Sequence, residues 1–431
     1  MTMPRLSVFP KPVRLSAMLA PDQNSFGVIR LAMALAVLFS HSYWFTTGSK
    51  LADPLVRFTG HSIGEHAVQV FFFLSGILVA QSLLRSRSVL NFAIARALRI
   101  FPALIVCVVL TAVVVGPLFT NGSLVQYFTD KQLPLYVLKT LLLITGSAPL
   151  PHLFHDQALP DMVNVSLWTL KYEVLCYIGL GIAGGIGLVN DRLRRVTTAL
   201  IAVLVVTAFV GQPKPLETYT FLDNLRYFTL YFYAGVLAYL VKDRLPVTGV
   251  VLIPLAIAYA ALVGTRFGEF ASCLFIGYAT LWFATFHFGG MRSFANRNDY
   301  SYGIYIYAGP IQQLVISILP EYGPMMVSLH SLAIALPLAV CSWELIERPA
   351  IAMRNPALLW IGSALLVAAR KVPWQVLPAW RISSDRMATV LSAPAIRRRA
   401  TTIHRGPATR ASRKTSQPGS NSEIGATTQL V

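Results

Sequence analysis

The stretch SFGVIRLAMALAVLFSHSYW, residues 25–44, is apolar enough to cross a membrane, yet it holds two ionisable side chains, Arg30 and His41. Ionisable residues inside a spanning segment mark functional sites by default. Eleven steps of α-helix turn through roughly 1100°, about 20° past three full turns, and rise about 16 Å. The spacing therefore predicts one helix face with a cation near one bilayer surface and a proton acceptor near the other.

The composition extends this reading to the whole chain. Of the 431 residues, 55% are hydrophobic and 13% are charged. One soluble core of this size could not bury so much apolar surface, so we expect an all-α, polytopic membrane protein. The four cysteines fall in separate apolar segments, without a CxxC pair or a Cys/His cluster, and predict neither a disulfide framework nor a metal site. Residues 1–25 lack the apolar core of a cleavable signal peptide.

Each crossing needs about 20 mainly apolar residues, and this requirement predicts ten transmembrane helices. They are 26–44, 66–84, 98–119, 166–189, 196–211, 225–241, 247–264, 270–287, 301–319 and 327–345. A further apolar stretch, 133–148, is interrupted by Lys139 and is assigned to a long external loop as a re-entrant or surface segment.

Charge bias sets the predicted orientation. With residues 1–25 in the cytoplasm, sixteen Lys and Arg of the connecting segments up to residue 354 lie inside and six lie outside. The positive-inside rule therefore favours ten crossings with both termini cytoplasmic. The predicted transmembrane domain covers 26–350.

The last segment, 351–431, has a different composition. From residue 355 onward it holds eleven Lys and Arg against two acids and is rich in Ser, Thr and Ala. Such a tail is expected to be largely disordered and to be attracted to anionic lipid head groups at the inner leaflet. Binding to nucleic acid is the less favoured alternative.

Three polar positions are candidates for chemistry. His41 is suited to act as a general base that removes a hydroxyl proton, because its ordinary pKa lies near working pH; the alternative is an interfacial histidine bonded to water. Glu173, in SLWTLKYEVLCYIGL, is expected at a similar depth and could orient His41; otherwise it forms a structural ion pair. Arg30 either holds an anionic donor through bidentate bonds or snorkels to the head groups.

Two further motifs lie toward the cytoplasmic side. Arg96 and Arg99 share one helix face in NFAIARALRIFP, where an RxxR pair suits the phosphates of a cytoplasmic donor; the alternative is a topology anchor. Ser75 and Gly76 follow three aromatics in AVQVFFFLSGILVA. Taken alone, that run is typical of lipid-facing surface with a close-packing glycine.

At these residues the sequence resembles the acyltransferase type 3 family, in particular its exopolysaccharide O-acetyltransferase-like branch. The matching motifs run in order along roughly residues 25 to 350. They are the R-x10-H of Arg30 and His41, FFFLSG at 71–76, RALRIFP at 96–102, SLWTLKYEVLCY at 166–177, NDYSYGIYIYAGPIQQ at 298–313 and WELIERP at 343–349. Two departures are Ala308, where many relatives carry a histidine, and Lys171, where proline is frequent.

The resemblance implies ten helices in the bacterial inner membrane and transfer of an acyl group, usually acetyl, from cytoplasmic acetyl-CoA or another acyl-CoA. The acceptor would be a hydroxyl of a glycan or lipid-linked sugar. It further implies that His41 is the base, that Arg30 and Glu173 support the site, and that Arg96 and Arg99 bind the CoA phosphates. Ser75 and Gly76 join the cofactor-binding candidates, and no metal is expected.

Other functions stay open at this point. Intramembrane His, Arg and Glu also build transport pathways, so a transporter of a lipid-linked sugar or acyl compound is the main alternative. A polysaccharide polymerase would place chemistry on the loop at about 120–165, but His152, His155, Asp156 and Asp161 there are typical of a solvated surface. The acyl group and the acceptor are not decided by the residues.

Overall fold

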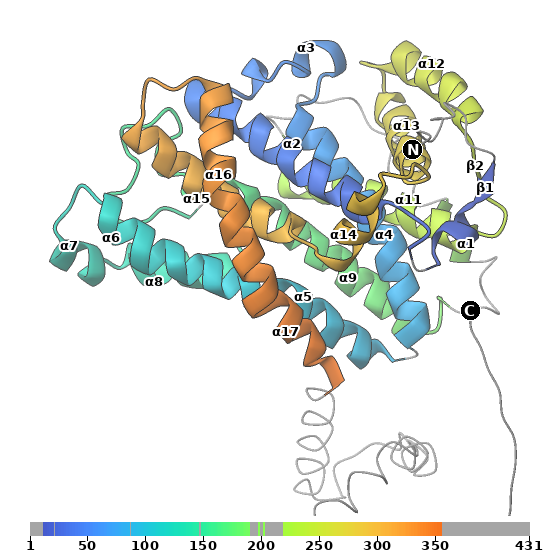
Figure 1. The fold of residues 1–431 in the computed structure, drawn as a ribbon, viewed down its shortest axis with the longest axis horizontal. Helices are drawn as coiled ribbons and strands as arrows, with labels where there is room; N and C mark the ends of the chain where they lie inside the picture. Colours follow the sequence, from blue (N-terminus) through green and yellow to red (C-terminus); the bar gives the residue numbers. More distant parts are fainter. Residues whose placement is uncertain are drawn as a thin grey trace, which may run out of the picture. The chain divides into compact units, whose positions relative to one another are not determined.

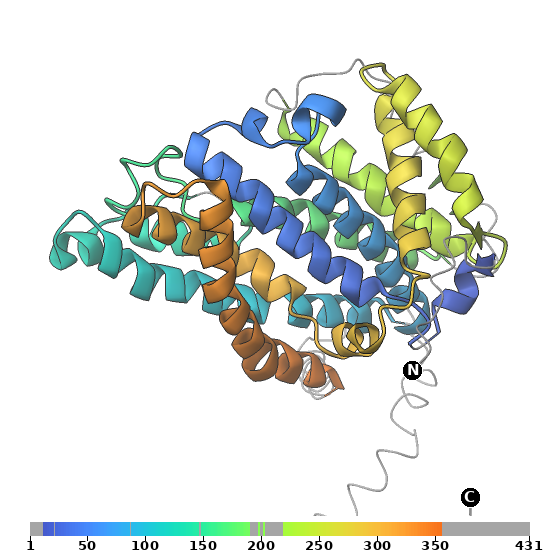
Figure 2. The same ribbon diagram turned by 45° about the horizontal axis from the view of Figure 1, so that its top comes forward.

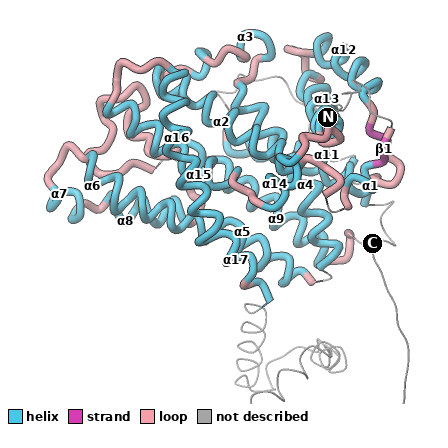
Figure 3. The backbone as a smooth tube through the Cα atoms, viewed as in Figure 1, coloured by secondary structure: helices cyan, strands magenta, loops and turns pink. Residues whose placement is uncertain are grey.

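The computed structural model describes residues 12–20, 22–86, 88–145, 148–189, 197–198, 201–202 and 219–355. Helices dominate these ranges (Figure 3). The sole strand pairing within them joins β1 (Val13–Arg14) and β2 (Pro246–Val247) as an antiparallel ladder of two residues. The predicted all-α class is confirmed, whereas the basic tail lies outside the described residues.

In the described ranges, nine helices of eleven or more residues and the ten-residue α8 make up the body of the fold (Figure 1). The nine are α2 (Phe26–Thr47), α4 (Ile63–Ser86), α5 (Val89–Leu110), α9 (Leu170–Gly185), α11 (Phe221–Leu240), α12 (Leu252–Leu262), α13 (Gly268–Phe283), α15 (Ser301–Ile318) and α16 (Pro324–Ser342). The shorter helices, with the ten-residue α8, are α1 (Leu15–Met18), α3 (Val56–Thr59), α6 (Gly116–Phe119), α7 (Leu124–Thr129), α8 (Gln132–Leu141), α14 (Gly290–Arg297) and α17 (Arg348–Ala352). Single turns of 3₁₀-helix are η1 (Lys50–Ala52), η3 (Val165–Thr169) and η5 (Gly249–Val251), and π-helical segments are η2 (Thr111–Val115) and η6 (Trp343–Glu347).

Five helical stretches in the described ranges are long and apolar enough to cross a membrane. They are Phe26–Thr47, Ile63–Ser86, Val89–Phe119, Val165–Gly185 and Pro324–Ala352. Four other predicted crossings are occupied by α11, α12, α13 and α15, whereas most of the predicted span 196–211 lies outside the described residues. The count of ten and the orientation of the termini stay predictions.

The helix that contains the third predicted crossing begins earlier than residue 98, at Val89. Ser88 accepts a hydrogen bond from the backbone N–H of Asn91 (3.3 Å) and so caps α5 at its amino end. Because α5 starts at Val89, Arg96 and Arg99 lie about two to three turns inside the helix rather than at its start.

The predicted re-entrant or surface segment, 133–148, contains the ten-residue helix α8. Ten residues rise about 15 Å, half of a hydrocarbon core of about 30 Å. The helix packs against α5 and η2, and Tyr136 on it is buried. This helix is therefore too short to cross the membrane by itself.

The helix α2 lies among α4, α15 and α16, and α4 in turn packs along α11 (Figures 1 and 2). The α4–α11 crossing brings backbone against backbone. A Cβ on Gly76 would lie 1.9 Å from the carbonyl oxygen of Phe232, and a Cβ on Gly235 would lie 2.1 Å from that of Phe73. Gly76 thus serves helix packing. It is not among the described residues that line the two cavities along α2, and its assignment as a cofactor-binding residue stays a prediction.

Replacing Gly76 by alanine is expected to destabilise the protein, because a carbonyl oxygen at 1.9 Å forces the two helices apart. We expect the midpoint of thermal unfolding in detergent to fall and the yield of folded protein to drop. Gly185→Ala in α9 is the matched control, since its Cβ would meet a side chain at an ordinary 3.6 Å. Equal midpoints for the two variants would contradict the close crossing.

Candidate active site

Two cavities lie along α2. The first, of about 130 Å³, is enclosed by α2, α4, α5, α9 and α15; its polar lining includes Arg30, Ser75, Arg96, Arg99, Glu173 and Tyr177. We call it the arginine cavity. The second, of about 50 Å³, includes His41, Lys50, Asp53, Glu65, Trp168 and Tyr227, and we call it the histidine cavity. Arg30 and His41 therefore face two neighbouring cavities, as expected for residues on one helix face.

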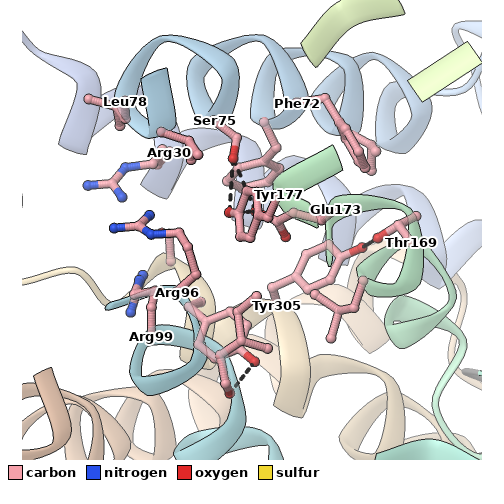
Figure 4. Close-up of a pocket in the computed structure, with 17 residues that line it drawn as sticks. Arg30, Phe72, Ser75, Leu78, Arg96, Arg99, Thr169, Glu173, Tyr177 and Tyr305 are labelled. Carbon is pink, nitrogen blue, oxygen red and sulfur yellow. Dashed lines mark hydrogen bonds between the residues drawn. The ribbon is translucent and has the colours of Figure 1, made fainter. Parts of the chain in front are cut away.

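The arginine cavity has a cationic end and an opposite end without cations. Figure 4 shows the guanidinium groups of Arg30, Arg96 and Arg99 gathered on one side of the cavity. Ser75 and Glu173 lie in the middle, and Tyr305 with Thr169 lies on the far side. The cavity is thus polarised along its length.

Two of the three arginines are held by buried carboxylates. Asp299, in the link between α14 and α15, accepts from Arg30 Nη1 at 2.8 Å and from Arg99 Nη2 at 2.5 Å. Arg99 Nη1 also donates to Glu347 at 2.6 Å, at the end of the π-helical η6. Ser301 Oγ donates to Asp299 at 2.5 Å and fixes its second oxygen. These bonds tie α2, α5 and η6 to the link before α15. The two arginines and the two carboxylates together form what we call the charge network.

The four members of the charge network are Arg30, Arg99, Asp299 and Glu347. Arg96 stands outside it. In the described part of the chain it has no carboxylate partner, its Nε is buried without a hydrogen bond, and its guanidinium lies 5.9 Å from the ring centre of Tyr177. Arg96 therefore has donors left for a ligand, whereas Arg99 is already paired.

Glu173 is bound by hydroxyl groups rather than by His41. It accepts from Ser75 Oγ at 3.2 Å and from the hydroxyl of Tyr177, one turn further along α9. The hydrogen bond of His41 goes instead to Ser166 in η3, with Nδ1 3.3 Å from Oγ. The expected contact between Glu173 and His41 is therefore not found. The two side chains line different cavities and have different hydrogen-bond partners.

Ser166, in the 3₁₀ segment η3, lies beside His41. The bond to Ser166 occupies Nδ1 and leaves Nε2 as the ring nitrogen without a hydrogen bond to the described residues. The rings of Trp44 and Phe45 flank His41 with centroid separations of 6.2 Å each. His41 is thus oriented by one polar contact and two aromatic walls.

Several polar residues of the site were not found from the sequence. Asp299 and Glu347 lie within the motifs NDYSYGIYIYAGPIQQ and WELIERP but had no assigned role. The signal that could have found them is charge balance, because arginines buried in a bundle need counter-charges. Asp53, which accepts from Ser40 Oγ at 2.5 Å, and Glu65 complete the histidine cavity and carried no motif.

Neither a metal site nor a catalytic loop is found among the described residues. Among the described residues, no group of three or more His, Cys, Asp or Glu side chains could hold a metal ion. The loop before η3 has one surface ion pair, between His155 and Asp161, and both side chains are about half exposed. The described residues of this loop include no buried pair of carboxylates, which a polymerase site would need.

The charge network predicts a dependence of stability on pH through Asp299. Burial raises the pKa of this carboxyl, but the charges of Arg30 and Arg99 and the bonds from Ser301 outweigh it and lower the pKa to about 2. The stabilisation is therefore present above the unfolded pKa near 4 and is lost as the pH falls toward 2. Removing one partner of a buried ion pair costs about 3–5 kcal/mol.

We therefore expect Asp299→Asn to lower the free energy of unfolding by that amount at pH 7, and to approach the wild type as the pH approaches 2. Unfolding in detergent as a function of pH measures both. Asp161→Asn, at the half-exposed pair with His155, is the control and should change stability by less than about 1 kcal/mol. A difference between wild type and Asp299→Asn that is constant with pH would refute the account.

Comparison with known proteins gives consistent matches. A family model described as an acyltransferase domain, acyltransferase 3, matches residues 23–344. An O-acetyl transferase of Shigella phage Sf6 is 32% identical over 348 residues, covering 78% of this chain and 98% of the phage protein. Nodulation protein 10 of Rhizobium leguminosarum bv. viciae is 29% identical over 365 residues, covering 77% and 94%. No solved structure matches significantly.

Proposed function

The chain belongs to the acyltransferase 3 family, and from this premise we propose that it transfers an acyl group, most simply acetyl, from cytoplasmic acyl-CoA to a hydroxyl of a glycan or lipid-linked sugar. The protein is an O-acyltransferase with several helices able to cross a membrane. The proposed location is the bacterial inner membrane. Membership of an acyltransferase family favours this reading over a transporter or a polymerase.

One observation supports the proposal above the others: the polarised arginine cavity lies next to the histidine cavity along α2. A donor bearing phosphates would place them at the cationic end, because guanidinium groups bind phosphate through charge-assisted hydrogen bonds. Its thioester would then point toward Tyr305 and, beyond it, toward His41. An acceptor hydroxyl would enter from the side of His41.

His41 would act as the general base. Its Nε2 takes the proton of the acceptor hydroxyl, and the oxygen forms a bond to the thioester carbonyl carbon. The bond from that carbon to sulfur then breaks, and the departing thiolate takes the proton from the imidazolium. The products are the ester and free CoA, and Ser166 would keep the imidazole ring oriented throughout.

Within the arginine cavity the proposed roles differ among the three arginines. Arg96 would bind the donor phosphates directly, since its donors are free among the described residues. Arg30 and Arg99 would shape the cationic end while paired with Asp299 and Glu347. Ser75 holds Glu173 and would fix the wall along which the pantetheine arm passes.

The lining of the histidine cavity is suited to a sugar as the acceptor. Trp44, Trp168 and Tyr227 provide aromatic faces in the histidine cavity, and Asp53 and Glu65 provide carboxylates. Apolar ring faces with a few convergent polar groups are the usual make-up of a small-molecule site. The Shigella phage relative is named as an O-acetyl transferase, and this name agrees with a hydroxyl acceptor.

His41→Ala is expected to lower the rate of acyl transfer by about 10²–10⁴-fold, the usual value of a positioned general base. Mass spectrometry of cell-surface glycans from a strain that carries the variant, and acetyl transfer by the purified protein in liposomes, both measure this loss. His330→Ala is the matched control, because His330 lies on α16 and lines neither cavity. Unchanged acylation in His41→Ala would eliminate His41 as the base.

Arg96→Ala is expected to raise the KM for acetyl-CoA by about tenfold to a hundredfold, because a hydrogen bond to a charged group is worth about 1.5–3 kcal/mol. Acetyl-pantetheine, which lacks the phosphates, should be used equally well by wild type and variant. Arg85→Ala, an exposed position at the end of α4, is the control. A similar loss with both donors would mean that Arg96 does not recognise phosphate.

A further inference from the structure

Two side chains, Val68 on α4 and Tyr305 on α15, line both the arginine cavity and the histidine cavity, and no other described residue lines both. We call them the partition. We propose that the partition sets the length of the acyl group that the enzyme transfers. This inference rests on the proposed function and names its specificity-determining residues.

Tyr305 is a fixed wall rather than a free side chain. Its hydroxyl forms a 2.5 Å hydrogen bond with Thr169 Oγ1, and its ring meets Phe71 edge-on with centroids 6.0 Å apart. Only 8% of the residue is exposed. Figure 4 shows the Tyr305 ring beside Thr169 at the end of the cavity away from the arginines. Both its ends are therefore held.

The backbone of η3 passes the same boundary. Trp168 lines the histidine cavity, whereas its neighbour Thr169 lines the arginine cavity. The bond from Thr169 to Tyr305 thus joins this segment to α15 at the point where the two cavities meet. Val68, 9% exposed, faces the same point from α4.

Reaction geometry places the acyl group at the partition. Reacting atoms must approach to about 3–3.5 Å. In the proposed function the thioester arrives from the arginine side and the hydroxyl from the side of His41, so the carbonyl carbon must reach the partition. The rest of the acyl chain then has to fit beside Val68 and Tyr305, next to cavities of only about 130 and 50 Å³.

Such a tight site discriminates by chain length. A single methylene more or less in a fitted pocket changes kcat/KM by about 10–200-fold. An acetyl group ends in a methyl group and needs the least room, whereas a butyryl group needs space that Val68 and Tyr305 fill. Shortening either side chain should therefore admit longer acyl groups.

The test measures kcat/KM for acetyl-, butyryl- and hexanoyl-CoA with the full-length protein in liposomes. We expect Val68→Ala and Tyr305→Ala to raise the ratio of butyryl to acetyl transfer by about tenfold or more. Tyr305→Phe, which keeps the ring, should keep the wild-type ratio. A gain with a longer donor is not produced by loss of stability, because destabilisation lowers the rates for all donors together.

Val70→Ala is the matched control, since Val70 lies on the same helix, is equally exposed at 9%, and lines neither cavity. If Tyr305→Ala does not fold, Val68→Ala decides the question alone. A wild-type ratio in Val68→Ala, or an equal gain in Val70→Ala, overturns the inference and leaves the proposed function standing. A wild-type protein that transfers from no acyl-CoA overturns the proposed function as well.

Discussion

The pairing of buried charges governs this structure. Arg30 and Arg99 lie on different helices, α2 and α5, and share the carboxylate of Asp299. Charged groups within a membrane protein need partners, since a lone charge there is strongly unfavourable. The shared carboxylate therefore fixes α2, α5 and the start of α15 relative to one another, and Glu347 adds η6. The cationic end of the arginine cavity is a consequence of this arrangement.

The opposite wall of the cavity depends on steric contact rather than charge. Consecutive helix residues point about 100° apart, so Ser75 faces Glu173 while Gly76 faces the carbonyl oxygen of Phe232 on α11. Because Gly76 allows α4 and α11 to touch along their backbones, α4 has little freedom to shift. Ser75, and Val68 two turns earlier, are thereby held at defined positions along the cavities.

The sequence predicted the helical class, most helix positions and the shared face of Arg30 and His41, because these follow from apolar runs and helical period. It missed what depends on tertiary contacts. Apolar content placed the start of the third crossing at residue 98, whereas the cap at Ser88 begins α5 earlier. Depth alone suggested a contact between Glu173 and His41, but depth does not fix the direction in which a side chain points. The roles of Asp299 and Glu347 could not be predicted, because their arginine partners are far away in the sequence and come together only in the folded protein.

Some hydrogen-bond donors of the arginine cavity are left without acceptors. Asp299 and Glu347 are both occupied by Arg30 and Arg99, and Glu173 accepts from two hydroxyls. Arg96 therefore has no carboxylate within the described residues, and the buried Nε atoms of Arg96 and Arg30 lack acceptors. Buried donors without acceptors are rare in folded proteins, so this end of the cavity suits a ligand with several anionic oxygens. Beyond the partition, His41 is among the side chains that line the second cavity. In the proposed function, the guanidinium donors on one side would bind the phosphates of the acyl carrier, and His41 on the other side would take the proton of the acceptor hydroxyl.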